Sequence, residues 1–150
     1  MAWDDLDGVA HYEKWARYGQ SKLANLLFTY GLDRRLRARS LPVLACAAHP
    51  GYAATNLQHV GPRMEGATLT AGIMTLGNAV LAQSAEHGAW PSVYAAAAAE
   101  VVGGAYYGPG IFDFWGAPKK VGSSRASRRE ADQDRLWEVS ESRTGVRWLD

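Results

Sequence analysis

Tyr18 and Lys22 stand four residues apart in the stretch YGQSKLANLLF, which spans residues 18–28. If the stretch is helical, this spacing places both side chains on one face. A free tyrosine has a pKa of about 10, and a cation held beside it lowers that pKa. A tyrosine tuned in this way can protonate a carbonyl oxygen as hydride arrives, or deprotonate an alcohol as hydride leaves. Taken alone, the pair is more simply interpreted as two unrelated residues on one helix, because chance gives roughly 0.2 such pairs in a chain of this composition.

The residues that must position this pair are predicted to form one helix over 18–39. Apolar residues recur there at three- and four-residue steps. They are Leu23, Leu26, Leu27, Tyr30 and Leu36. Four arginines follow in the last turns, where cations suit the helix dipole. They are Arg34, Arg35, Arg37 and Arg39, and they predict a solvated basic helix end.

Two short strands are predicted around this helix. Val43 to Ala48 is an apolar run bounded by Pro42 and by the Pro50–Gly51 turn, which suits a strand buried on both faces. Cys46 lies within this run and is expected to be an inert core residue. The letters AYY at 105–107 predict a second strand that ends at Gly108–Pro109. The long path between them implies a parallel pair with a right-handed crossover. Because two buried strands do not make a sheet, the chain is predicted to be part of an α/β domain.

Further helices are predicted in the second half of the chain. One spans Thr68 to Gln83, after a glycine-rich loop. Ser84 can cap the next, which runs through WPSVYAAAAAE until Gly103–Gly104 stops it. A final helix is predicted from Ser127 to Ser142.

Composition limits the classes of function. The 150 residues are 47% hydrophobic and 21% charged, which is typical of a globular protein. The net charge of +1 gives no reason to expect nucleic-acid binding. One cysteine excludes an internal disulfide, and the four histidines show no ligand spacing, so no metal is expected. The first residues lack the apolar core of a signal peptide, and the longest apolar stretch, 71–82, is too short to span a bilayer. A soluble, cytoplasmic protein is therefore expected.

Several motifs, in the right order, resemble the short-chain dehydrogenase/reductase family. YGQSKLAN resembles that family's Tyr-x-x-x-Lys helix, and HPG followed by YAATNL resembles its Pro-Gly turn and the threonine after it. GGAYYGP, RLWEVSESRTGV and an early WDDL resemble the retinol-dehydrogenase-like or protochlorophyllide-reductase-like branch. The resemblance implies a Rossmann-type doubly wound parallel sheet. It also implies hydride transfer between NADP or NAD and a carbonyl or alcohol substrate.

The resemblance also implies roles for individual residues. Tyr18 would be the general acid/base, and Lys22 its pKa-lowering partner and a ligand of the cofactor ribose. Pro50 and Gly51 would let the backbone approach the nicotinamide, although a simple strand-ending turn is the alternative. Two residues are predicted to bind the cofactor next to this turn: Thr55 and Asn56. Family members commonly dimerise through the tyrosine-bearing helix, so a homo-oligomer is expected.

Three family motifs have no counterpart in the 150 residues. These are the Thr-Gly-x-x-x-Gly-x-Gly turn that meets the cofactor pyrophosphate, the Asn-Asn-Ala-Gly strand, and the strand that carries the catalytic serine. The chain therefore resembles the C-terminal half of a member, and is predicted to be a single partial domain over 1–150. It is expected to be an oxidoreductase that is inactive alone. The alternative is a non-catalytic fragment or pseudoenzyme that acts through association.

Overall fold

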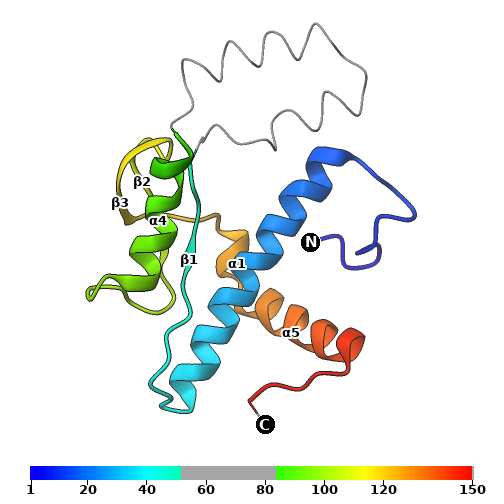
Figure 1. Cartoon of the computed structure of the whole chain (residues 1–150). Coiled ribbons are helices and arrows are strands. Elements are labelled where there is room, and N and C mark those ends of the chain that lie inside the picture. Colours follow the sequence, from blue (N-terminus) through cyan, green and yellow to red (C-terminus); the bar gives the residue numbers. More distant parts are fainter. Residues whose placement is uncertain (52–83, 150) are drawn as a thin grey trace, which may run out of the picture. The chain divides into compact units, whose positions relative to one another are not determined.

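The computed structural model describes residues 1–51 and 84–149, which form two compact units. Unit 1 comprises Met1–Ala47, Val102–Gly104 and Gly122–Asp150, and unit 2 comprises Ala48–Val101 and Ala105–Val121. The elements in chain order are α1 (Lys14–Ala38), β1 (Ala47–Ala48), α4 (Ala85–Ala97), β2 (Tyr106–Ile111), β3 (Trp115–Lys120), the 3-10 helix η1 (Ala126–Arg128) and α5 (Glu130–Thr144) (Figure 1). The α/β class is confirmed. The prediction of one partial domain stays a prediction.

Helix α1 begins at Lys14, four residues before the predicted start. Its cap is Glu13, whose carboxylate accepts hydrogen bonds from the backbone N–H groups of Trp15 (3.0 Å) and Ala16 (2.6 Å). Glutamate is an uncommon cap, so this helix start is hard to predict from local sequence. As a result Tyr18 lies in the second turn of the helix.

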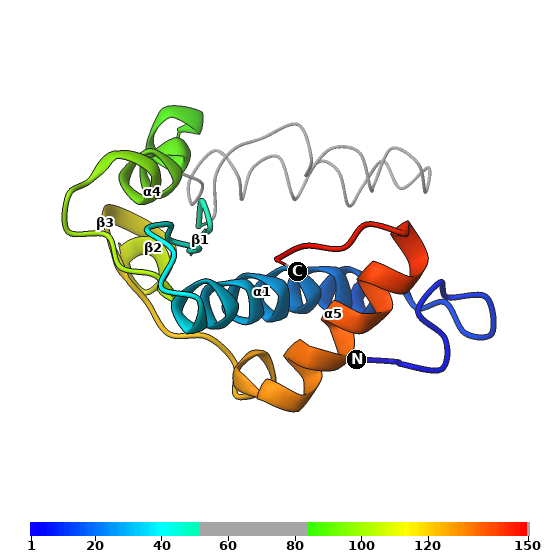
Figure 2. The same ribbon diagram turned by 90° about the horizontal axis from the view of Figure 1, so that it is seen from below.

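Unit 1 is held together by the packing of α5 along α1 (Figures 1 and 2). The rings of Phe28 and Trp137 stack with centroids 5.3 Å apart, and the Arg35 guanidinium lies 4.4 Å from the Trp137 ring centroid. Arg34 and Arg35 both pair with Asp134 of α5, Arg35 at 2.8 Å. The prediction of a solvated basic helix end is therefore wrong for these two arginines. Their partner lies about 100 residues away in sequence, beyond any local pattern.

Two glycines of α1 give a prediction on the stability of this unit. A Cβ at Gly19 would meet no heavy atom within 4 Å, whereas one at Gly31 would lie 3.3 Å from the Cβ of Gln133 on α5. Gly19→Ala should raise the free energy of unfolding by about 0.5–1 kcal/mol, because alanine has the higher helix propensity. Gly31→Ala should lower it by about 1 kcal/mol, because crowding of α5 outweighs the same gain. Urea unfolding of both variants is the measurement, and a gain for both would contradict the packing of α1 on α5.

Unit 2 is a β-hairpin covered by α4 (Figure 1). Strands β2 and β3 pair antiparallel, with Tyr107 opposite Lys120 and Pro109 opposite Pro118. Strand β3 was not predicted, and β2 does not end at Gly108–Pro109 as expected. The two prolines face each other next to an irregularity in the register between Pro109 and Ile111, where a missing N–H costs little.

Helix α4 starts as the sequence predicts. Ser84 is its cap, and the Ser84 hydroxyl accepts a hydrogen bond from the His87 N–H at 3.2 Å. The helix ends at Ala97, well before the predicted stop at Gly103–Gly104. Ala98 leaves the helical conformation, with φ −76° and ψ 138°, and its N–H donates to the Tyr94 carbonyl. The Tyr94 ring faces Tyr107 of β2, with ring centroids 5.4 Å apart.

The strand predicted over 43–48 is shorter and less buried than expected. Only Ala47–Ala48 form β1, which runs parallel to β2 at the edge of a sheet ordered β1-β2-β3. Val43 and Leu44 are exposed, since no strand lies beyond β1 among the described residues. Cys46 is partly exposed, and burial raises the pKa of its thiol.

The helix predicted over Thr68–Gln83 lies outside the described residues. Within residues 1–51 and 84–149, no helix combines the length and the apolar character needed to cross a bilayer.

The final helix begins at Glu130 rather than Ser127, because residues 126–128 form η1 instead.

Candidate functional site

Tyr18 and Lys22 share one exposed face of α1, as their spacing predicts. The Lys22 ammonium lies over the Tyr18 ring, 5.2 Å from its centroid. The Tyr18 side chain is about half exposed, at 49%. Within the part of the chain that the structure describes, Lys22 forms no salt bridge with a carboxylate, so its charge is not neutralised there. The pair therefore presents a phenol and a cation together to solvent.

Trp15 extends this face toward the start of the helix. Its ring meets the Tyr18 ring edge-on, with centroids 6.4 Å apart and an interplanar angle of 86°. Lys14 lies 5.2 Å from the Trp15 ring centroid. Trp15 was not predicted as part of the site, although its position three residues before Tyr18 places it on the same helical face. The indole gives the phenol an apolar neighbour on the side opposite Lys22 along the helix.

Ser21 lies between the pair in sequence but does not join it. Its hydroxyl donates to the backbone carbonyl of Tyr18 at 2.8 Å, a local contact within the helix. Such bonding is common for serine inside helices. Ser21 is therefore a small helix residue beside the pair, with its hydroxyl bonded to its own helix.

The Pro50–Gly51 turn belongs to unit 2, and its geometry explains the glycine. Gly51 has φ +67°, and a Cβ there would lie 2.7 Å from Pro109 Cγ and 2.8 Å from the Phe114 carbonyl oxygen. Both the conformation and the space therefore exclude a side chain. Whatever this turn meets in solution, its glycine is already required by contact with the β2–β3 hairpin.

His49 supports the same turn. Its Nδ1 accepts a hydrogen bond from the Gly51 N–H at 3.2 Å, and its ring lies 4.9 Å from that of Tyr106. Burial lowers the pKa of His49, and the Asp113 carboxylate partly offsets this effect. A Cβ at Gly108 would fall 2.0 Å from His49 Nε2, so the imidazole fills space that only glycine leaves open. His49 is thus a structural support for the turn.

The remaining predicted site residues stand as follows. Thr55 and Asn56 lie outside the described residues. Tyr18 and Lys22 belong to unit 1, whereas Pro50 and Gly51 belong to unit 2. No group of three or more potential metal ligands occurs among residues 1–51 and 84–149.

Known proteins resemble this chain over almost its whole length. Human polyprenol dehydrogenase is 34% identical over 145 residues, which cover 95% of this chain and 40% of the human protein. Human retinol dehydrogenase 13 is 38% identical over 149 residues, covering 95% of this chain and 41% of that protein. The crystal structure of an uncharacterised protein from Mycobacterium paratuberculosis matches with a TM-score of 0.74 at 34% identity, over 99% of this chain and 46% of that one. No protein-family model matches the chain.

The chain belongs to the short-chain dehydrogenase/reductase family. It matches the C-terminal part of retinol-dehydrogenase-like members, so the resemblance predicted from its motifs is confirmed. The chain spans about two fifths of the length of the curated relatives that it matches.

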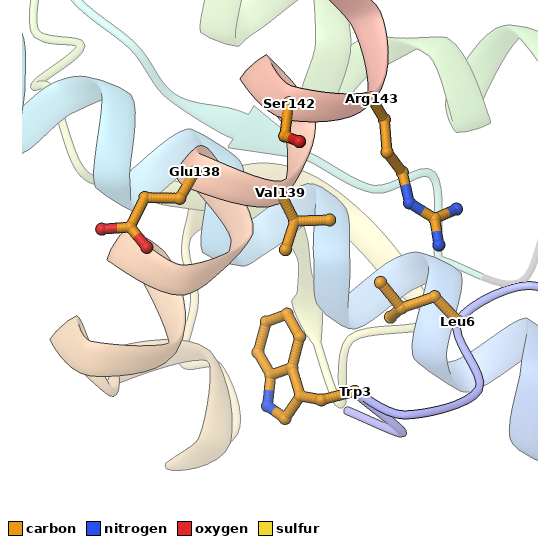
Figure 3. Close-up of a pocket in the computed structure, with 6 residues that line it drawn as sticks. All are labelled: Trp3, Leu6, Glu138, Val139, Ser142 and Arg143. Carbon is orange, nitrogen blue, oxygen red and sulfur yellow. The ribbon is translucent and has the colours of Figure 1, made fainter.

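The hollows in unit 1 of this short-chain dehydrogenase/reductase chain do not coincide with the predicted pair. A cavity of about 380 Å³ lies between the N-terminal segment and α5. Figure 3 shows its lining residues, which are Trp3, Leu6, Glu138, Val139, Ser142 and Arg143. A second cavity of about 460 Å³ shares three of these residues and extends to Ser21 on α1. Neither Tyr18 nor Lys22 lines either cavity, so we assign these hollows to the packing of the N-terminal segment rather than to the reaction.

Proposed function

We propose that this chain carries the proton-transfer part of an NAD(P)-dependent oxidoreductase that acts on a carbonyl or alcohol. The observation that carries the proposal is the exposed Tyr18 ring with the Lys22 ammonium 5.2 Å from its centroid. Family membership supports it, because relatives along 95% of the chain are named as dehydrogenases. Tyr18 holds the proton that moves to or from the substrate oxygen. Lys22 stabilises negative charge on the phenol oxygen and offers donors to ribose hydroxyls.

The residues of this chain fit the reacting end of the dinucleotide and not its pyrophosphate. The cofactor, when bound, supplies or accepts the hydride. Pyrophosphate is usually held at a helix N-terminus that follows a strand through a glycine-rich turn. Among the described elements, no helix begins in this way. Helix α1 is capped by the Glu13 carboxylate, and α5 carries Glu130 and Asp132 in its first turn, charges that disfavour a phosphate.

We further propose that the substrate is an apolar alcohol or its carbonyl form. The relatives are named for polyprenol and retinol, which are alcohols with long unsaturated chains. The exposed indole of Trp15 beside Tyr18 supports this choice, since it offers an apolar surface next to the phenol. Thr55 and Asn56, with Pro50 and Gly51, are proposed to meet the nicotinamide end of the cofactor. A homo-oligomer and a cytoplasmic location remain predictions.

Titration of the purified chain with NADPH and NADH tests this function. Several charge-assisted hydrogen bonds to phosphate, each worth about 1.5–3 kcal/mol, are missing. Binding should therefore be millimolar or weaker, detectable by saturation-transfer NMR, and no turnover is expected from the chain alone. Lys22→Met should abolish this weak binding. Lys14→Met is the matched control, because Lys14 lies at the same 5.2 Å over an aromatic ring of the same helix.

The outcomes separate the two functions considered. Weak binding that depends on Lys22 but not on Lys14 supports the oxidoreductase. Binding that neither variant changes would favour the alternative of a non-catalytic chain that acts through association. Micromolar binding would contradict the proposed lack of a phosphate site.

A further inference from the structure

The tip of the β2–β3 hairpin exposes a cluster of large apolar side chains, which we call the hairpin tip. It consists of Ile111, Phe112 and Phe114, whose exposed fractions are 54%, 84% and 45%. Trp115 follows at the start of β3, with its ring centroid 5.5 Å from that of Phe114. Single exposed apolar residues are ordinary, but three within four positions at the end of a hairpin form an apolar projection.

The backbone of the hairpin tip is strained in a way that keeps the Phe112 ring outside. Phe112 and Asp113 have φ of 50° and 61°, in the left-handed region that bulky residues avoid. The Phe114 N–H donates to the Ile111 carbonyl at 3.0 Å and closes the turn. Tight hairpin turns with two positive φ angles strongly prefer Asn-Gly or Asp-Gly. Strain held at a bulky, exposed position points to a use for that side chain, because the fold would be more stable without it.

The hairpin tip is also firmly supported from below. Gly51 packs so closely that an added Cβ would lie 2.8 Å from the Phe114 carbonyl oxygen and 3.0 Å from that of Asp113. Burial lowers the pKa of His49, and the exposed Asp113 carboxylate lies near enough to offset part of that lowering. The carbonyl oxygens of Asp113 and Phe114 therefore lie against Gly51, and exposed apolar side chains make up most of the outward surface.

The hairpin also carries positive charge, which favours an anionic partner. Lys119 and Lys120 are both exposed on β3, and Asp113 is the only acid in the hairpin. An aromatic tip with a closed backbone turn, and two lysines further along β3 opposite Gly108 and Tyr107, matches an anionic bilayer surface, whose charged headgroups lie over an apolar interior. A protein partner would need complementary polar groups at the rim, and Asp113 is the one polar side chain among residues 111–115.

We propose that the hairpin tip docks on anionic lipid bilayers, with Phe112 and Ile111 entering the interface and Lys119 and Lys120 facing the headgroups. This contact is peripheral, and it is independent of the proposed oxidoreductase activity. It would hold the Pro50–Gly51 turn, which packs against the hairpin, near the membrane.

Sedimentation with vesicles tests the proposal on the full 150-residue chain. Binding is expected to mixed phosphatidylcholine–phosphatidylserine vesicles and to fall in high salt, because screening weakens the lysine contribution. Phe112→Asn should lower the partition coefficient by about tenfold or more, since a buried phenylalanine ring is lost. Each of Lys119→Gln and Lys120→Gln should lower it roughly fivefold on these vesicles and have little effect on pure phosphatidylcholine.

The same variants exclude misfolding as an explanation. Asparagine tolerates positive φ, so Phe112→Asn should raise the melting temperature by roughly 2–8 °C while it weakens binding. Asp113→Gly relieves the same turn but keeps the ring, so it should raise the melting temperature and preserve binding. Trp148→Asn removes an exposed aromatic outside the hairpin and should leave binding unchanged. Unchanged vesicle binding by Phe112→Asn overturns the proposal. So does a chain that ignores vesicles but forms an oligomer that Phe112→Asn dissociates, which would assign the tip to a protein partner.

Discussion

Replacing Tyr18 by phenylalanine is expected to lower turnover at least about 100-fold without unfolding the chain. General acid–base groups typically contribute 10²–10⁴-fold to rate, and the substitution removes only the hydroxyl that would carry the proton. The ring remains, and with it the edge contact to Trp15 and the position of the Lys22 ammonium. The measurement is hydride transfer by this chain combined with a segment that supplies the dinucleotide phosphate site. Circular dichroism would report that α1 is retained.

Tyr12→Phe is the matched control for this prediction. Tyr12 is exposed and lies just before α1, but it has no lysine over its ring among the described residues. Its loss of a hydroxyl should leave turnover unchanged. If Tyr18→Phe retained activity within about threefold of the unmodified chain, Tyr18 would not be the acid/base, and the proposed reaction would need another proton donor.

The features that the sequence predicts correctly depend on local periodicity. The helix that carries Tyr18 and Lys22 follows from apolar residues at three- and four-residue steps, and the shared face of the pair follows from their spacing. Ser84 is a cap in the structure because its hydroxyl needs only the N–H three residues later. In each case the deciding interaction lies within one or two turns of chain, so the sequence contains both partners side by side.

The features that the sequence misses depend on contacts across the chain. Strand β3 contains Gly116 and Pro118, which argue against a strand when considered alone. They are tolerated because Pro118 faces Pro109 and because Gly116, at φ +92°, packs beside Ile111. Likewise, the arginines of α1 read as solvated until Asp134 of α5 supplies their partner. Local propensity was overridden by tertiary contact in both cases.

The candidate site, too, was predictable only where its geometry depends on local sequence. The types and spacing of Tyr18 and Lys22 were sufficient to place them together. The cofactor role predicted for Pro50 and Gly51 stays a prediction. The reason for Gly51 was not predictable, because Pro109 and the Phe114 carbonyl reach it from a hairpin that the sequence did not reveal. The hairpin tip was missed for the same reason. A run of aromatic residues can be identified as a surface projection only once a turn with positive φ is known to direct it outward.

Gly103→Ala is expected to lower the free energy of unfolding by about 3–5 kcal/mol. A Cβ at Gly103 would fall 2.0 Å from Asp33 Oδ1, and the Asp33 carboxylate is buried. Asp33 pairs with Arg37 at 2.7 Å, and Arg37 also donates to the Gly103 carbonyl. The methyl group would push the carboxylate away from Arg37, the cation it pairs with among the described residues, while leaving it out of water, which carries a cost of this size.

Comparison with a second glycine and a double-mutant cycle would identify the cause of this loss. A Cβ at Gly122 meets no heavy atom within 4 Å, so Gly122→Ala should leave stability within about 0.5 kcal/mol. Asp33→Ala should itself destabilise unit 1, because it leaves Arg37 without its carboxylate. In that background, however, the space next to Gly103 is vacant. Gly103→Ala should therefore lower the free energy of unfolding by less than half of what it does in the unmodified chain.

Equal losses of stability in the two backgrounds would show that backbone conformation, and not the buried carboxylate, requires glycine at this position. Urea unfolding of the four proteins measures this coupling directly, and a large coupling energy would establish that Asp33 joins α1 to residues 102–104.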